Sequence, residues 1–122
     1  MEQKRIAIVD DDTTYRRMLR KTLETAGYRV SEAKNALEVY GLGAYDLMLL
    51  DIRMPGIDGH KVLTSLKEDK GASPVIVITG LSDPEEMKHA FTEGADAFML
   101  KPVDAEDLLA KITELLARPS AS

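Results

Sequence analysis

The chain has 122 residues, a length that fits one domain with a sizeable hydrophobic core. Apolar residues make up 44% and charged residues 30%, as in ordinary globular proteins, and the absence of Cys excludes cysteine nucleophiles and Cys-ligated zinc or iron–sulfur sites. The net charge of −5 argues against binding to nucleic-acid phosphates by electrostatics alone, so no direct nucleic-acid partner is expected.

Short apolar runs alternate with helical patterns along the chain. The runs at 6–9, 47–50, 75–78 and 97–100 are apolar throughout, which is typical of parallel strands covered on both faces. Segment 29–33 alternates in polarity and is predicted as an edge strand. Apolar stripes at helical spacing, with Gly and Pro as boundary signals, predict helices around 15–26, 62–66, 84–93 and 108–116.

This alternation predicts an α/β domain with right-handed crossovers and helices on both faces of a parallel sheet. We assign residues 1–117 to that domain and residues 118–122 to a flexible tail or the start of a linker. Residues 35–40 leave room for barely two turns before Gly41-Leu42-Gly43, so the second helix should be short.

The apolar segments are too short for a membrane or for a secretion signal. The first apolar run stops at Val9, and no stretch approaches the ~18 apolar residues of a membrane span. We therefore expect a cytoplasmic protein without a membrane partner.

Polar residues follow the four runs that are apolar throughout, at the point where each predicted strand ends. They are Asp10, Asp11 and Asp12, then Asp51, then Thr79, then Lys101. Because the carboxyl ends of parallel strands meet at one edge of the sheet, we expect these side chains to lie close together. Two carboxylates ~5 Å apart repel by roughly 3 kcal/mol at an effective dielectric of ~20, so the cluster requires a cation or raised carboxyl pKa values. Lys101 and a Mg²⁺ ion would supply that charge, an arrangement suited to phosphoryl transfer.

Single residues of this set also have structural interpretations. An Asp after a strand is often a helix N-cap, and Asp12 or Thr13 is expected to cap the first helix. His60 and His89 each stand alone, without a ligand partner at a trusted spacing, and are predicted not to bind metal. Gly56 and Gly59 are predicted as turn glycines.

Four motifs resemble the receiver domain of two-component response regulators, in the family's order and spacing over residues 4–117. They are Ile8-Val9-Asp10-Asp11-Asp12, Leu50-Asp51-Ile52-Arg53-Met54-Pro55-Gly56-Ile57-Asp58-Gly59, Val77-Ile78-Thr79-Gly80 and Met99-Leu100-Lys101-Pro102. The resemblance implies a flavodoxin-like, doubly wound, five-stranded parallel sheet with strand order 2-1-3-4-5. It also implies a cis bond between Lys101 and Pro102.

The resemblance also implies a role for each motif residue. Asp51 matches the phosphorylated aspartate. The implied Mg²⁺ ligands are Asp10 (largely through water), Asp11, Asp51 and the backbone carbonyl of Arg53. Thr79 and Lys101 match the catalytic residues that bind the phosphoryl group. Thr79 and Phe98 match the switch pair.

By this resemblance the chain is a phosphorelay switch and not a turnover enzyme, although it would catalyse its own phosphorylation and dephosphorylation. The implied donor is a sensor histidine kinase or phosphotransfer protein, and Mg²⁺ is the implied cofactor. Phosphorylation would switch the surface formed by the fourth helix, fifth strand and fifth helix, which controls an output partner or domain. The resemblance also allows a homodimer on phosphorylation.

Three other functions are disfavoured by particular residues. An aspartyl phosphatase usually carries a second Asp two residues after its nucleophile, where this chain has Arg53. A flavin carrier would have a Ser/Thr/Gly-rich loop after the first strand, where this chain has three acids. A degenerate receiver used only for protein interaction would not need the intact acidic set.

Overall fold

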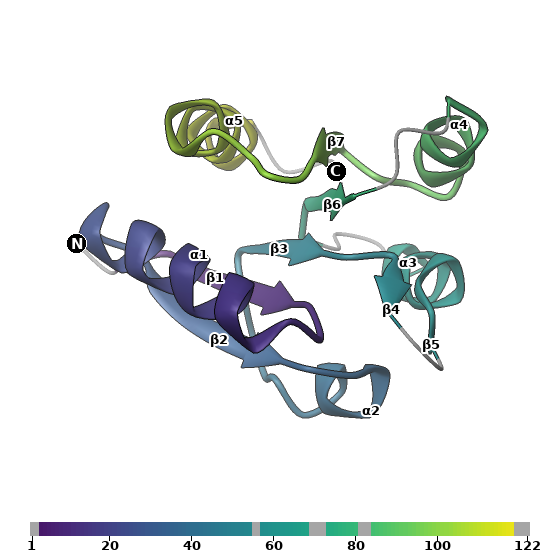
Figure 1. Cartoon of the computed structure of the whole chain (residues 1–122), viewed down its shortest axis with the longest axis horizontal. Coiled ribbons are helices and arrows are strands. Elements are labelled where there is room, and N and C mark those ends of the chain that lie inside the picture. The colour runs from purple at the N-terminus through teal and green to yellow at the C-terminus, as the bar shows by residue number, and fades with distance from the viewer. Residues whose placement is uncertain (1–2, 55–56, 69–72, 81–83, 119–122) are drawn as a thin grey trace.

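The computed structural model describes residues 3–54, 57–68, 73–80 and 84–118. The central sheet is parallel and has the strand order β2-β1-β3-β6-β7 (Figure 1). Its members are β1 (Arg5–Val9), β2 (Arg29–Ala33), β3 (Leu47–Leu50), β6 (Val75–Thr79) and β7 (Ala97–Leu100). In chain order these are the first to fifth strands of the sheet, so the predicted order 2-1-3-4-5 is confirmed.

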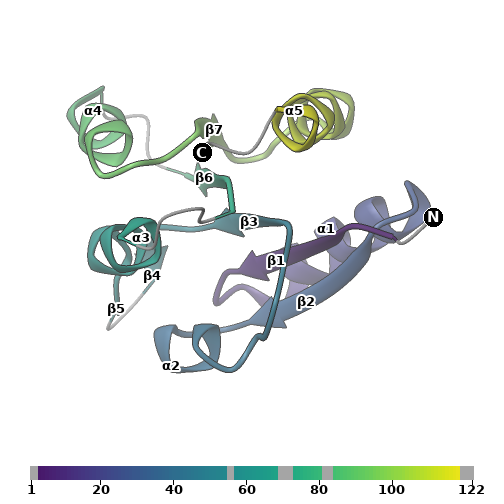
Figure 2. The same ribbon diagram turned by 180° about the vertical axis from the view of Figure 1, so that it is seen from behind.

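Helices cover both faces of the sheet. The helices α1 (Thr13–Thr25) and α5 (Ala105–Ala117) lie on one face, and α2 (Ala36–Val39), α3 (Gly59–Lys67) and α4 (Pro84–Thr92) on the other, as Figures 1 and 2 show from opposite sides. Every helix in the described ranges is too short or too polar to span a bilayer.

The strands that are apolar throughout contribute side chains to two separate hydrophobic clusters, one on each face of the sheet. Alternate residues of a strand point to opposite faces. In β1, Ala7 and Val9 therefore pack with the α2–α3–α4 side, while Ile6 and Ile8 pack with Leu19 and the rest of the α1–α5 side. This burial on both faces explains why the strands show no polar alternation.

The second helix is as short as the sequence predicts. It spans four residues, capped by the Asn35 side chain, which accepts a hydrogen bond from the Glu38 N–H at 2.9 Å. So short a helix covers little of the sheet, and Leu37 and Tyr40 remain 83% and 68% exposed. The predicted cap of α1 is confirmed at Asp12, which accepts from the Tyr15 N–H at 3.1 Å.

A small antiparallel pair that the sequence did not predict follows β3. It joins β4 (Arg53–Met54) to β5 (Ile57–Asp58) and leads directly into α3. Gly59 is the first residue of α3 and not a turn glycine, whereas Gly56 lies outside the described residues. A Cβ on Gly59 would lie 2.3 Å from the Ile52 Cα, so only glycine lets α3 pack this closely on the chain leaving β3.

We expect Gly59→Ala to lower the free energy of unfolding by about 1–3 kcal/mol, because the Ile52 backbone must move to admit the methyl group. Urea unfolding measures this loss. The matched control is Gly41→Ala, where the nearest atom to an added Cβ is 3.6 Å away. Equal stability of the two variants would contradict the steric explanation.

Candidate functional site

The site lies where β1, β3, β6 and β7 end, and the strand register sets its geometry. Val9 of β1 pairs with Leu50 of β3, so the residues that follow them, Asp10 and Asp51, leave the sheet at the same level. The Asp51 N–H donates to the Val9 carbonyl at 2.9 Å. At the other side, Lys101 follows β7, and its N–H donates to the Thr79 carbonyl at 2.9 Å. The ladder thus brings four chain segments to one edge.

The ammonium group of Lys101 joins two buried carboxylates. Its Nζ lies 2.7 Å from Asp10 Oδ2 and 2.9 Å from Asp51 Oδ2, and the two aspartates are only 3% and 5% exposed. The remaining oxygens also accept hydrogen bonds, Asp10 Oδ1 from the Asp12 N–H at 2.9 Å and Asp51 Oδ1 from the Arg53 N–H at 2.8 Å. Each oxygen of the two buried carboxylates therefore has one donor, which compensates part of the cost of removing it from water.

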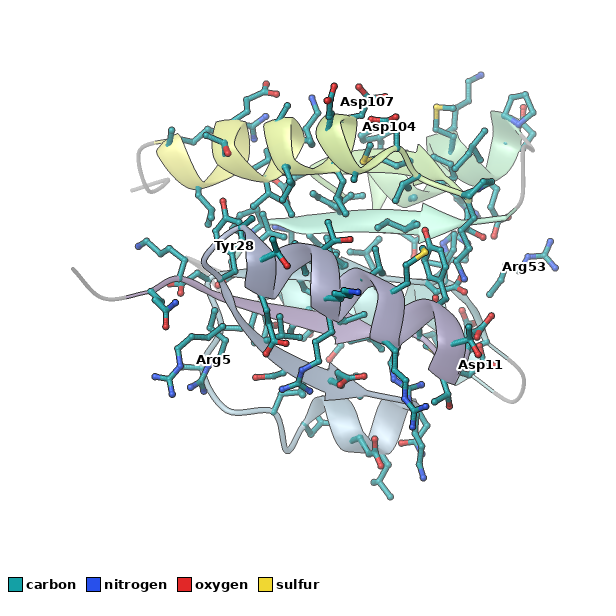
Figure 3. The ribbon with its side chains drawn as sticks, turned by 60° about the vertical axis from the view of Figure 1, so that its left-hand side comes forward. Arg5, Asp11, Tyr28, Arg53, Asp104 and Asp107 are labelled. Carbon is teal, nitrogen blue, oxygen red and sulfur yellow. The ribbon has the colours of Figure 1, made fainter. Side chains whose placement is uncertain are left out.

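Asp11 completes a set of three carboxylates. One oxygen each of Asp10, Asp11 and Asp51 lies within 4.8 Å of the others, so the predicted acidic residues do converge. Asp11 is exposed, and Figure 3 shows it at the same end of the molecule as Arg53, opposite Arg5. The Arg53 side chain extends outward into solvent, and only its backbone N–H contacts Asp51.

An open pocket of about 620 Å³ gives access to this set. Its lining residues are Asp11, Asp12, Asp51, Arg53, Thr79, Gly80 and Lys101. Thr79 is the last residue of β6 and is fully buried. A small anion such as a phosphoryl group could enter this pocket and meet a carboxylate, a hydroxyl and an ammonium group together.

The pocket shifts the pKa values of its central pair. Burial raises the pKa of Asp51 above its ordinary value, although the Arg53 N–H and the Lys101 ammonium act against that rise. Burial acts to lower the pKa of Lys101, but Asp10 and Asp51 outweigh it and hold that pKa above its ordinary value. Lys101 therefore stays positively charged at neutral pH, beside a carboxylate that is more basic than a free aspartate.

Two residues of α1 support the site and were not predicted. The Lys101 Nζ lies 4.6 Å from the centre of the Tyr15 ring, within the range of a cation–π contact. Arg16 Nη1 donates to the Asp10 carbonyl at 2.6 Å, and its Nε donates to Glu32 Oε1 on β2 at 3.0 Å. Their position in the sequence could have predicted this role. Tyr15 and Arg16 lie in the first turn of a helix that begins after Asp12, and that turn must pass beside the pocket.

The predicted switch pair lies on one face of the sheet. Phe98 pairs with Val77 in the β6–β7 ladder, and Thr79 lies two residues beyond Val77 on the same side. Phe98 is half-buried and packs against the cluster of the α2–α3–α4 face. The Lys101–Pro102 bond is cis, as the resemblance implied.

Comparisons with known proteins agree with this geometry. The profile of the response regulator receiver domain matches residues 6–113. The transcriptional regulatory protein ResD of Bacillus subtilis is 36% identical over 97% of this chain and 50% of its own length, so the chain spans about half of that relative.

Solved structures give the same result for the fold. A CheY-like receiver domain protein from Methanospirillum hungatei superposes with a TM-score of 0.87 at 37% identity, covering 94% of each chain. The BeF3-activated receiver domain of DrrB, a Thermotoga maritima protein, gives a TM-score of 0.88 at 30% identity over 96% of this chain and all of its own.

Replacing the central cation tests the electrostatic description. We expect Lys101→Met to lower the free energy of unfolding at about pH 7.5 by about 1–3 kcal/mol, since two buried carboxylates lose their shared donor. The pKa of Asp51 should rise further in the variant. A raised carboxyl pKa means that the folded state binds more protons than the unfolded state, so the variant regains stability as pH falls toward about 5.

Urea unfolding at both pH values measures this change. Lys111→Met is the control, because Lys111 pairs with Glu114 at 2.9 Å on the exposed surface of α5 and should change stability by less than about 0.5 kcal/mol. A stability loss in Lys101→Met that does not shrink at the lower pH would contradict the described pairing.

Proposed function

The chain belongs to the response regulator receiver domain family, and we propose that it is the phosphoryl-accepting switch of a two-component phosphorelay, with Asp51 as the acceptor. One observation carries the proposal: the Asp51 carboxylate is buried beside Lys101 at 2.9 Å, at a pocket that also holds Asp11 and Thr79. Receiver domains act as phosphoacceptor switches and not as classical enzymes.

The proposed reaction transfers one phosphoryl group. An Asp51 oxygen attacks phosphorus and forms an O–P bond, while the N–P bond of a phosphohistidine breaks and the imidazole nitrogen leaves with the electron pair. The donor is a sensor histidine kinase or phosphotransfer protein. Lys101 offsets the charge on the phosphoryl oxygens, and the Thr79 hydroxyl binds one of them. Water later attacks the acyl phosphate and regenerates the Asp51 carboxylate.

The donor set of the acidic cluster fits a Mg²⁺ ion. Three carboxylates whose oxygens converge within 4.8 Å offer the all-oxygen environment that this ion prefers. Asp10, Asp11 and Asp51, with the Arg53 carbonyl, are the residues that would hold it. When bound, the ion would neutralise negative charge on the phosphoryl group during transfer.

The proposed switch connects the pocket to a surface. Movement of the Thr79 hydroxyl toward a phosphoryl group would open space on the face of the sheet that also carries Phe98, and the ring would turn inward. This would change the surface of α4, β7 and α5. Met87, Phe91 and Leu100 are 41%, 46% and 44% exposed there, so a partner, including a second copy of the chain, would cover apolar side chains.

The output of the switch is also a proposal. The relatives are named as transcriptional regulators, and one as DNA-binding, but this chain spans about half of their length. We propose that residues 1–117 form the receiver unit, without direct nucleic-acid contact, and control a separate output domain or partner. Residue 118 begins the proposed tail or linker, of which residues 119–122 lie outside the described part.

The acceptor can be tested directly. Incubation with acetyl phosphate and Mg²⁺ should add the mass of a single phosphoryl group in intact-mass spectrometry, and Asp51→Asn should abolish the adduct, because the amide cannot attack phosphorus as a carboxylate does. Asp107→Asn on α5 is the matched control and should be modified like the unaltered chain. An adduct that persists in Asp51→Asn would refute the assignment.

The metal site gives an independent prediction. Mg²⁺ at 100 times its Kd should raise the free energy of unfolding by about 2.7 kcal/mol. Asp11→Asn should remove most of this gain, and without Mg²⁺ it should be at least as stable as the unaltered chain because one repulsive charge is gone. Urea unfolding with and without Mg²⁺ measures both effects. Equal Mg²⁺ stabilisation of both proteins would exclude Asp11 as a ligand.

A further inference from the structure

A second cluster of ionisable groups lies between α3 and α4, which run side by side in both Figure 1 and Figure 2. His60, in the first turn of α3, has a carboxylate at each ring nitrogen. Its Nε2 lies 2.7 Å from Glu86 Oε1 on α4, and its Nδ1 contacts Glu93 Oε1 just after α4. Thr64 fixes the second oxygen of Glu93 through a 3.0 Å hydrogen bond from its hydroxyl.

His89 adds a second imidazole to this cluster. Its ring centre lies 5.4 Å from that of His60, and one ligand atom each of His60, His89 and Glu93 lies within 4.8 Å of the others. Glu86 and His89 are three residues apart and so share one face of α4, and Glu93 follows His89 by four residues, directly after the helix ends. The prediction that the two histidines stand alone is therefore wrong.

We propose that His60, His89 and Glu93 form a binding site for a divalent transition-metal ion such as Zn²⁺, separate from the acidic pocket. Two imidazoles and a carboxylate are the ligand set that Zn²⁺ takes at three-ligand sites, with a fourth position for water. Mg²⁺, which prefers oxygen ligands alone, is disfavoured there. The two sites thus differ in the chemistry of their donors.

The hydrogen bonds around His60 already have the pattern of a metal ligand. Histidine ligands usually donate their other ring N–H to a carboxylate, which fixes the ring. If the Nε2–H of His60 donates to Glu86, the Nδ1 that now faces Glu93 is the atom left for the ion. Glu86 is then a positioning residue, and Thr64 holds Glu93 in place.

Charge explains why a cation belongs between these groups. Burial acts to lower the pKa of His60, but Glu86 and Glu93 outweigh it and hold that pKa above its ordinary value. The side chains of His60, Glu86 and Glu93 are each only 18–21% exposed, so a metal ion bound among them would interact in a poorly screened environment.

The ligands come from both helices, so the bound ion would link α3 to α4. In a tetrahedral site, ligand atoms about 2.0–2.2 Å from the ion lie about 3.3–3.6 Å apart, so the three ligand atoms, which now lie within 4.8 Å of one another, must reach that spacing. His89 is exposed and can supply this movement by turning its ring.

The chain contains two histidines, so NMR of the imidazole protons reads the site directly. We expect Zn²⁺, added to the metal-stripped full chain, to shift the resonances of both rings at one equivalent. Isothermal titration should show His89→Gln and Glu93→Gln weakening this binding by more than about 10-fold, and Glu86→Gln by about 10- to 100-fold. Glu106→Gln, an exposed carboxylate on α5, should bind as the unaltered chain does.

The acidic pocket is the competing location for the ion. Asp11→Asn should leave Zn²⁺ binding unchanged, whereas a loss of binding in this variant would assign the ion to that pocket and overturn the proposal. Unshifted histidine resonances, or full affinity in His89→Gln, would also overturn it. Because His89 is exposed, its replacement should keep the backbone amide spectrum of the folded chain, which separates loss of a ligand from loss of structure.

Discussion

The ammonium of Lys101 between the carboxylates of Asp10 and Asp51 is the interaction on which the site depends. Both acids are almost wholly buried, and each would raise the energy of the other without a shared positive charge. The same lysine lies over the Tyr15 ring, so it also joins α1 to the end of β7. One side chain thus offsets part of the negative charge of the pocket and connects two of the elements that line it.

This pairing depends on the register of the strands. The site residues follow strands whose side chains are buried on both faces, and their register brings Asp10 and Asp51 out at the same level. Arg16 and the close approach of Gly59 to Ile52 then hold the two loops that leave the sheet. The positions of the site residues at the edge therefore depend on the packing of the hydrophobic core on both faces of the sheet.

The sequence was sufficient for the sheet and for most of the site, for a physical reason. Strands such as 47–50 are buried on both faces and so carry an unbroken apolar signal, and residues after parallel strands must meet at one edge. Contacts between side chains of different elements produce no comparable pattern in the sequence. The His60 cluster joins two helices across 33 residues, and the β4–β5 pair is too short for any periodicity. Gly59 depends on a backbone contact that no sequence pattern encodes.

The helix α4 is attached to the body of the protein differently from α5. Its buried side is a single alanine, Ala90, whereas α5 buries Leu108, Ile112 and Leu115. Polar groups hold one flank of α4 against α3, and Met87 and Phe91 are exposed. Apolar side chains of α4 therefore contribute little to the core, and polar contacts to α3 form a large part of its attachment. A change of charge on these polar groups should therefore affect the position of α4 more than that of α5, which three buried apolar side chains hold in place.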